Sequence, residues 1–306
     1  MADLRRQQHS LDVLRRLRWP VPGRLGVHPW GDERSGVLGP GVEYADAREY
    51  QFGEDSRLID WNLTARSDSA FVRLSHPDRG IDVWLLVDVS PSLDWGTANC
   101  LKKDLAVEFA DAAALLLTRY GNRVGAIVFD STVRRIVSPT PGRHGRHSVV
   151  ATLRAAVSDP GAGGTDLELA LRTARRLVRR PSLLIVISDF LLDAAGWRRE
   201  MRAVAERHEV VAVRVVDPRE LEIPDIGVVT FEDPETGRQV EVDTSSRRLR
   251  ERFRAAAAEQ RARFTGEVRE ARGIPIEIST GRELVQQLVV ILRAEQARQR
   301  RLRSAR

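Results

Sequence analysis

The chain has 306 residues, of which 42% are hydrophobic and 30% charged, and its formal net charge at pH 7 is +6. This length and apolar content suffice for one sizeable core or two small ones, and they exclude an intrinsically disordered chain. No run approaches the roughly 18 consecutive apolar residues that a membrane-spanning helix needs, and the polar N-terminus has no hydrophobic signal core. We therefore expect a soluble, cytoplasmic protein. The single cysteine, Cys100, excludes an internal disulfide and a cysteine-cluster metal site.

Hydrophobic periodicity predicts the secondary structure in chain order. Leucines at helical spacing predict a short amphipathic helix over residues 4–18, and a Pro- and Gly-containing stretch ends it. From Val83 onward, apolar runs of strand length alternate with helical patterns. Strands are predicted at 83–88, 123–129, 131–138, 183–188, 209–215 and 274–279, and helices at 101–120, 148–157, 166–178, 197–207, 247–272 and 282–301. Residues 228–244 interrupt the alternation with two strand patterns joined through DPETG, which predicts an inserted β-hairpin.

This alternation favours an α/β fold, namely a doubly wound, mostly parallel, Rossmann-like sheet with helices on both faces. We expect an N-terminal extension over residues 1–80 that packs on the main domain, an α/β domain over 81–295 and a basic tail over 296–306. Sheets of this kind bind ligands at the carboxyl ends of their strands. Side chains that follow the predicted strands are therefore the candidates for a site.

Basic charge is concentrated at the two ends of the chain. Residues 296–306 contain five arginines and no acidic residue, and residues 1–24 are also rich in arginine. Such ends can bind nucleic acid or anionic surfaces, although a solvated helix end has the same composition. Because no aromatic platform or base-reading module accompanies them, nucleic-acid binding is a secondary alternative.

Five oxygen-bearing side chains stand at predicted strand ends or loops. Asp88, Ser90 and Ser92 leave the strand at 83–88 at alternate positions, Thr165 follows a glycine-rich loop, and Asp189 follows the strand at 183–188. An all-oxygen set suits a hard cation such as Mg²⁺, with Mn²⁺ as a second possibility. Neutral hydroxyls leave the cation's charge incompletely neutralised, so a partner's carboxylate can complete the coordination. Alternatively, the serines cap a turn and the threonine caps a helix, which explains each residue singly but not the set.

The motif D-x-S-x-S at Asp88–Ser92, followed by Thr165 and by Asp189 after an apolar strand, resembles the metal-ion-dependent adhesion site of von Willebrand factor A domains. The resemblance implies that fold. It also implies that Ser90, Ser92 and Thr165 contact the metal directly, whereas the two aspartates are ligands or act through water.

A second resemblance involves Gly41–Gly80, with the sequence GVEYADAREYQFGEDSRLIDWNLTARSDSAFVRLSHPDRG. This segment is similar to the signature of the DUF58 family, which implies a von Willebrand factor A domain beside it and a MoxR-type AAA+ ATPase as a bacterial partner. Many relatives carry N-terminal membrane helices, and this chain resembles the short soluble branch. The segment's alternating charges among aromatic residues indicate either an ion-pair network that fixes it to the main domain or a docking surface for another protein.

Enzyme readings find less support in the sequence. A phosphoryl-transferring Asp88 would need a second acid two residues later, where Ser90 stands. No G-x-S-x-G elbow or G-x-x-x-x-G-K-[ST] phosphate loop is present, and His144 and His147 share a predicted loop without an obvious acidic partner. Two further acids near the motif, Asp94 and Asp166, leave an Mg²⁺-dependent hydrolase or phosphatase open as the alternative.

The sequence thus predicts a non-enzymatic protein-interaction module that depends on Mg²⁺ or Mn²⁺. The partner would supply an acidic residue to the metal, and the DUF58 resemblance implies a MoxR-type ATPase in that role, in chaperone-like assembly or maturation.

Overall fold

The computed structural model describes Trp19 and residues 43–51, 59–67, 69–76, 80–119, 121–159, 163–192, 196–232 and 239–304. The helix predicted at residues 4–18 lies outside these residues. The chain divides into two compact units, one of residues 27–80 and the other of residues 1–26 together with 81–306. That the N-terminal segment packs on the main domain stays a prediction.

The smaller unit is built on the antiparallel strands β1 (Glu43–Glu49) and β2 (Phe71–His76). A short helix, α2 (Trp61–Thr64), precedes β2. Asp60 caps this helix, because its Oδ1 accepts hydrogen bonds from the backbone N–H groups of residues 62 and 63, at 3.1 and 3.2 Å. Val72 is buried, whereas Trp61 exposes 67% of its surface and so does not serve as a core residue here.

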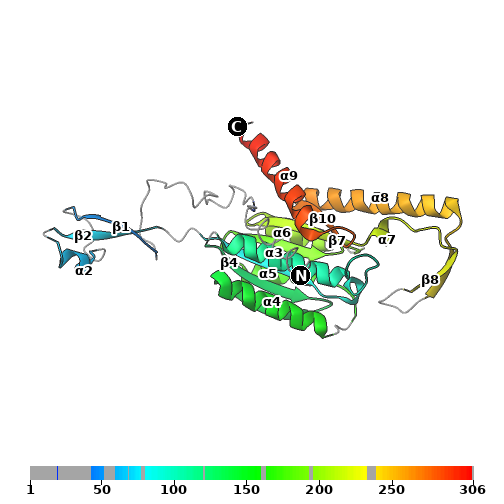
Figure 1. Cartoon of the computed structure of the whole chain (residues 1–306), viewed down its shortest axis with the longest axis horizontal. Coiled ribbons are helices and arrows are strands. Elements are labelled where there is room, and N and C mark those ends of the chain that lie inside the picture. The colour runs from blue at the N-terminus through cyan, green and yellow to red at the C-terminus, as the bar shows by residue number, and fades with distance from the viewer. Residues whose placement is uncertain are drawn as a thin grey trace, which may run out of the picture. The chain divides into compact units, whose positions relative to one another are not determined.

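The larger unit contains a six-stranded sheet with the strand order β10-β7-β6-β3-β4-β5. Figure 1 colours its strands and helices along the chain and labels several of them. The strands of the sheet are β3 (Asp82–Asp88), β4 (Arg123–Phe129), β5 (Val133–Pro141), β6 (Ser182–Ser188), β7 (Glu209–Val216) and β10 (Ile274–Ser279). All neighbouring pairs are parallel except β4 with the edge strand β5. The central strands read as continuous apolar runs because both of their faces are buried; Val83, Leu85, Leu86 and Val87 have no exposed surface.

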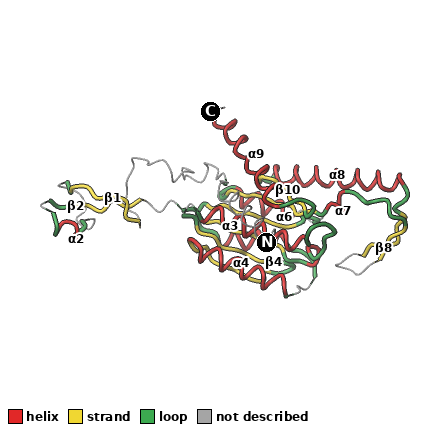
Figure 2. Tube along the Cα trace, viewed as in Figure 1, coloured by secondary structure: helices red, strands yellow, loops and turns green. Residues whose placement is uncertain are grey.

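Helices cover the sheet on both faces (Figure 2). They are α3 (Lys102–Thr118), α4 (Gly142–Ser158), α5 (Leu167–Leu177), α6 (Gly196–Ala205), α8 (Arg247–Glu270) and α9 (Leu284–Ser304), with the short α7 (Pro218–Leu221) and a 3₁₀ turn at Pro91–Leu93. Helix α3 packs beside α4 and α9, whereas α6 packs beside α5 and α8. A core cluster joins alternate strand residues such as Leu86 and Val186 to α5, α6 and α8. The predicted α/β fold with a doubly wound, mostly parallel sheet is therefore confirmed.

The predicted hairpin is present between α7 and α8. Its strands, β8 (Val228–Glu232) and β9 (Gln239–Asp243), pair antiparallel as a separate two-stranded sheet.

The largest difference from the predicted boundaries is at the start of α4. Helix α4 begins at Gly142 instead of residue 148, so His144 and His147 lie on a helix and not in a loop. Glycine and histidine are weak helix formers, and packing of α4 against β4 and β5 outweighs that preference. The predicted basic tail from residue 296 continues α9 as far as Ser304 within the described residues. In that part of the chain, no helix combines the length and hydropathy needed to cross a bilayer.

Candidate cation site

The site begins at the carboxyl end of β3. Asp88, the last residue of that strand, is 1% exposed. Its Oδ1 accepts a hydrogen bond from the backbone N–H of Ser90 at 2.9 Å, and its Oδ2 accepts one from the hydroxyl of Ser188 at 2.7 Å. Because Ser188 ends the neighbouring parallel strand β6, strand pairing itself brings these two ends together.

Three hydroxyl groups gather next to Asp88. The Oγ atoms of Ser90 and Ser92 lie 3.1 Å apart, and Thr165 donates a hydrogen bond from Oγ1 to the Oγ of Ser90 at 2.7 Å. Ser90 precedes the 3₁₀ turn, yet its side chain makes no capping hydrogen bond. Asp166, not Thr165, caps α5 by accepting from the N–H of residue 169 at 2.8 Å. The capping alternative therefore does not account for Ser90 and Thr165.

Asp189 follows β6 and is 2% exposed. Its Oδ1 accepts a hydrogen bond from the backbone N–H of Leu191 at 3.2 Å. The pKa of Asp88 is raised to about 7, because burial and the negative charge of Asp189 both disfavour its ionisation by more than the hydrogen bonds from Ser188 and Ser90 favour it. The five predicted residues thus lie at the carboxyl ends of β3 and β6 or in the loop before α5, with the hydroxyls in direct contact and the two carboxylates interacting electrostatically.

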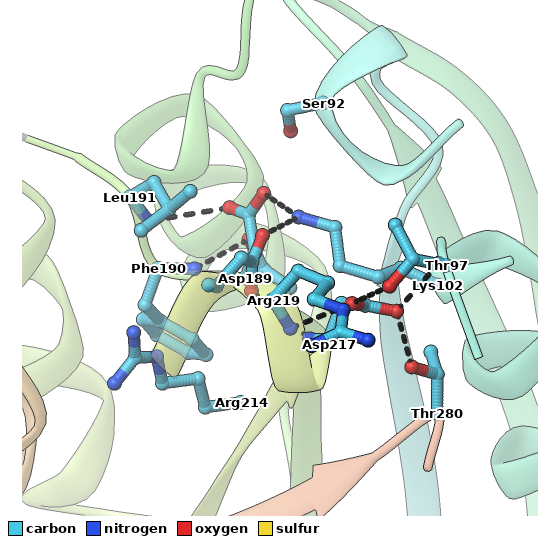
Figure 3. A network of polar contacts seen from close by, with 12 residues as sticks. Ser92, Thr97, Lys102, Asp189, Phe190, Leu191, Arg214, Asp217, Arg219 and Thr280 are labelled. Atoms are coloured by element: carbon cyan, nitrogen blue, oxygen red, sulfur yellow. Dashed lines mark hydrogen bonds and ion pairs between the residues drawn. The ribbon is translucent and has the colours of Figure 1, made fainter. Parts of the chain in front are cut away.

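A buried lysine joins the site from α3. The Nζ of Lys102 lies 3.0 Å from Oδ2 of Asp189 and 2.7 Å from Oε1 of Glu220 in α7 (Figure 3). Burial lowers the pKa of Lys102, but the charges of Asp189 and Glu220 more than offset that effect, so the pKa is raised. Sequence reasoning missed Lys102, which pairs with Asp189, and Glu220, the second carboxylate on that lysine. The one available signal is composition, since all but two of the chain's 49 basic residues are arginine.

A third buried carboxylate, that of Asp217, holds the segment that carries Glu220. Its Oδ1 and Oδ2 accept hydrogen bonds from the hydroxyls of Thr97 and Thr280, each at 2.6 Å, and from the N–H groups of Thr97 and Arg219 at 2.8 and 2.9 Å (Figure 3). Burial raises the pKa of Asp217, and the hydrogen bonds from Thr280 and Thr97 lower it by more. Asp217 and Glu220 also form a capping box at α7, which fixes Glu220 toward the lysine.

The donor set fits a hard cation. It combines the hydroxyl oxygens of Ser90, Ser92 and Thr165 with the carboxylate oxygens of Asp88, which are the kind of ligands that Mg²⁺ prefers. Within the described residues, no group of three or more His, Cys, Asp or Glu side chains has a metal-holding arrangement, so a cation here would depend on the hydroxyls. The two acids considered for a hydrolase serve other contacts: Asp94 pairs with Lys103 at 2.6 Å, and Asp166 caps α5.

The fold and the candidate cation site define the class of this protein: a doubly wound α/β protein with oxygen-bearing side chains clustered at the carboxyl ends of neighbouring parallel strands. The family described as "Protein of unknown function DUF58" matches residues 46–263, and the chain belongs to that family, as its signature predicts.

The chain is also similar to a curated relative and to solved structures. An uncharacterized protein of Mycobacterium tuberculosis is 38% identical over 279 residues, which cover 90% of this chain and 87% of that protein. The solved structure of BatB from Bacteroides thetaiotaomicron has 18% identity and a TM-score of 0.48, covering 72% of this chain and all of BatB. The SpRpn10 VWA domain has 11% identity and a TM-score of 0.38, covering 68% of this chain and 93% of that domain.

Proposed function

We propose that this protein is a non-enzymatic interaction module in which Mg²⁺ or Mn²⁺ links the hydroxyl cluster to a carboxylate of a protein partner. Ser90, Ser92 and Thr165 would hold the cation through their hydroxyl oxygens, and Asp88 and Asp189 would act as ligands or through water. The bound cation supplies the positive charge that attracts the partner's Asp or Glu. The observation that carries the proposal is the contact of three hydroxyl oxygens from two separate segments, 2.7 and 3.1 Å apart, beside two buried carboxylates.

The charge balance of the site supports this proposal. Asp88, Asp189 and Glu220 bring three carboxyl groups together, Lys102 contributes one ammonium group, and the buried guanidinium of Arg214 also interacts electrostatically with Asp189 and Glu220. Burial and the neighbouring Asp189 both disfavour ionisation of Asp88, so a divalent cation placed there would relieve an existing electrostatic cost. The hydroxyls add no charge, which leaves a bound cation positive enough to recruit an external carboxylate.

The cation test compares two threonine variants of the full chain. Thr165→Ala removes a hydroxyl of the cluster, whereas Thr118→Ala removes one that donates to backbone carbonyls of its own helix α3, those of Ala114 and Leu115. Calorimetric titration with MgCl₂ and MnCl₂ should give saturable binding to the wild type and the Thr118 variant, and binding at least about tenfold weaker to the Thr165 variant. Absence of binding to the wild type, or equal affinity of the two variants, contradicts the cation site.

The partner test uses a MoxR-type AAA+ ATPase, because the DUF58 resemblance points to that class. Purified ATPase from the same organism is captured on the immobilised full chain with Mg²⁺ or with EDTA. We expect capture by the wild type and by Thr118→Ala in Mg²⁺, and loss of capture in EDTA or with Thr165→Ala. Equal recovery under all conditions rules out a metal bridge to this ATPase.

The non-enzymatic assignment has its own test. Phosphatase and nuclease substrates are incubated with the wild type and Asp88→Ala in Mg²⁺ and in Mn²⁺. Turnover by the wild type that disappears in the variant would replace the interaction module with a metal-dependent hydrolase.

A further inference from the structure

A second surface lies away from the oxygen cluster, where the inserted hairpin faces the start of α8. A groove of about 800 Å³ is bounded there by Phe231 and Val242 of the hairpin and by Leu249 and Phe253 of the helix. Ile223, in the connection from α7 to the hairpin, also lines it. The groove therefore has apolar side chains on both of its walls.

The hairpin's apolar face is incompletely covered. Val229 pairs with Val242 and Phe231 pairs with Val240, so these four residues share one face of the two-stranded sheet. Phe231 exposes 40% of its surface and Val240 46%. A two-stranded hairpin is marginal by itself and gains stability from what packs on its apolar face, so a partly exposed face of this kind marks an interaction surface.

The charged side chains that line the groove are both positive. Arg248 and Arg252 line it, are exposed and stand one helical turn apart on α8. Neither has an ion-pair partner within the part of the chain that the structure describes. The other arginines of these turns are paired, namely Arg247 with Glu251, Arg250 with Asp225 and Arg254 with Glu222. The two arginines left over are those that face the groove.

We propose that this groove binds an amphipathic helix of a protein partner. The helix would place its apolar side chains between the hairpin and α8, and acidic side chains one turn apart against Arg248 and Arg252. A groove with apolar walls suits the i, i+4 spacing of a helix's apolar residues. The two arginines that line it, which have no ion-pair partner among the described residues, favour acidic side chains on the bound helix. This docking surface is independent of the cation site, since none of the five oxygen residues lines it.

The test uses a synthetic helical peptide of about 18 residues, with leucines on one face and two glutamates one turn apart beside them. Its binding to the full chain is followed by fluorescence anisotropy in EDTA, so that failure of the cation site does not affect the result. The site variant is Arg248→Glu/Arg252→Glu. The control, Arg269→Glu/Arg293→Glu, makes the same change of net charge at exposed positions outside the groove. A second peptide carries lysines in place of the glutamates.

We expect the site variant to bind the acidic peptide about tenfold more weakly than the wild type, with the control variant within about twofold. The lysine peptide should bind the site variant better than it binds the wild type. Absence of peptide binding to the wild type, or equal weakening in both variants, overturns the proposal. The proposal is also overturned if the wild type self-associates or binds phosphatidylserine vesicles and the site variant abolishes that behaviour. A second copy of the chain or an anionic membrane would then be the occupant of the groove.

Discussion

The ammonium group of Lys102 lies 3.0 Å from the Oδ2 atom of Asp189, and the two side chains are 2% and 3% exposed. Lys102 thus supplies Asp189 with the counter-charge that a bound cation would otherwise provide. Two positive charges confined near one carboxylate repel each other, and low solvent exposure leaves that repulsion poorly screened. We infer that Lys102 weakens cation binding while it stabilises the cation-free protein.

Substitution of the lysine separates these effects. Lys102→Met leaves Asp189 and Glu220 without their shared partner, and we expect the free energy of unfolding in EDTA to fall by about 3 kcal/mol. Saturating Mg²⁺ should restore more stability to this variant than it adds to the wild type, as measured by urea denaturation. The matched control is Lys103→Met, which breaks only a surface pair with Asp94 and should cost less than about 1 kcal/mol. An Mg²⁺ response equal in both variants contradicts competition between Lys102 and the cation.

The raised pKa of Asp88 predicts a pH dependence of stability in the absence of cations. Its pKa in the folded protein, about 7, lies above the ordinary value of 3.8, so the protonated form contributes stability that is fully present below about pH 3.8. This contribution is lost as the pH rises through about 7. In EDTA, the unfolding free energy of the wild type minus that of Asp88→Asn should therefore fall between pH 5 and pH 8, at up to about 1.4 kcal/mol per pH unit. A difference that is flat, or that rises with pH, contradicts the shift.

The buried carboxylate of Asp217 is expected to be a main source of stability at this edge of the sheet. Asp217→Ala leaves two threonine hydroxyls and two backbone N–H groups without their acceptor, and we expect a loss of about 3 kcal/mol in urea denaturation. Asp243→Ala serves as the comparison, since this exposed aspartate also accepts bonds from a backbone N–H and a hydroxyl, both of Ser245. Its loss should be clearly the smaller of the two. Equal losses would mean that burial of the network adds nothing.

Two helical glycines should respond in opposite directions to alanine. At Gly145 in α4, a Cβ atom would clash with the backbone carbonyl oxygen of Thr140, so Gly145→Ala should cost about 2 kcal/mol. At Gly266 in α8, a Cβ atom would meet nothing within 4 Å, so Gly266→Ala should stabilise the protein by about 1 kcal/mol through helix propensity. Thermal unfolding of both variants measures whether each substitution raises or lowers the stability. Stabilisation by both would show that α4 can move away from Thr140.

The contact between Gly145 and Thr140 also explains why the sequence misplaced the start of α4. The residues GRHGRH have a weak local preference for a helix. Gly145 lets this part of α4 lie close to the backbone of Thr140 in β5, and hydrophobic periodicity gives no information about that tertiary contact. The strands were easier to predict, because a parallel sheet buried on both faces requires continuous apolar runs, and β3 and β6 have them.

In the candidate site, too, some contacts follow from the predicted strands and others depend on tertiary packing. Asp88, Ser188 and Asp189 sit at the ends of neighbouring parallel strands, so their proximity follows from strand order and length. Lys102 meets Glu220 across 118 positions of sequence, through a helix and a short turn that no periodic pattern relates. Such an ion pair is a result of tertiary packing alone.

The two lysines have a further consequence, because they are the only ones in the chain and are adjacent. A lysine-specific endoprotease can cut only at this point, in the first turn of α3, where Lys102 is anchored by Asp189 and Glu220. Cleavage there requires that turn to open, so the rate of proteolysis reports directly on opening of the candidate site. Limited proteolysis of the unmodified protein can therefore measure how often this part of α3 opens locally, without an added label.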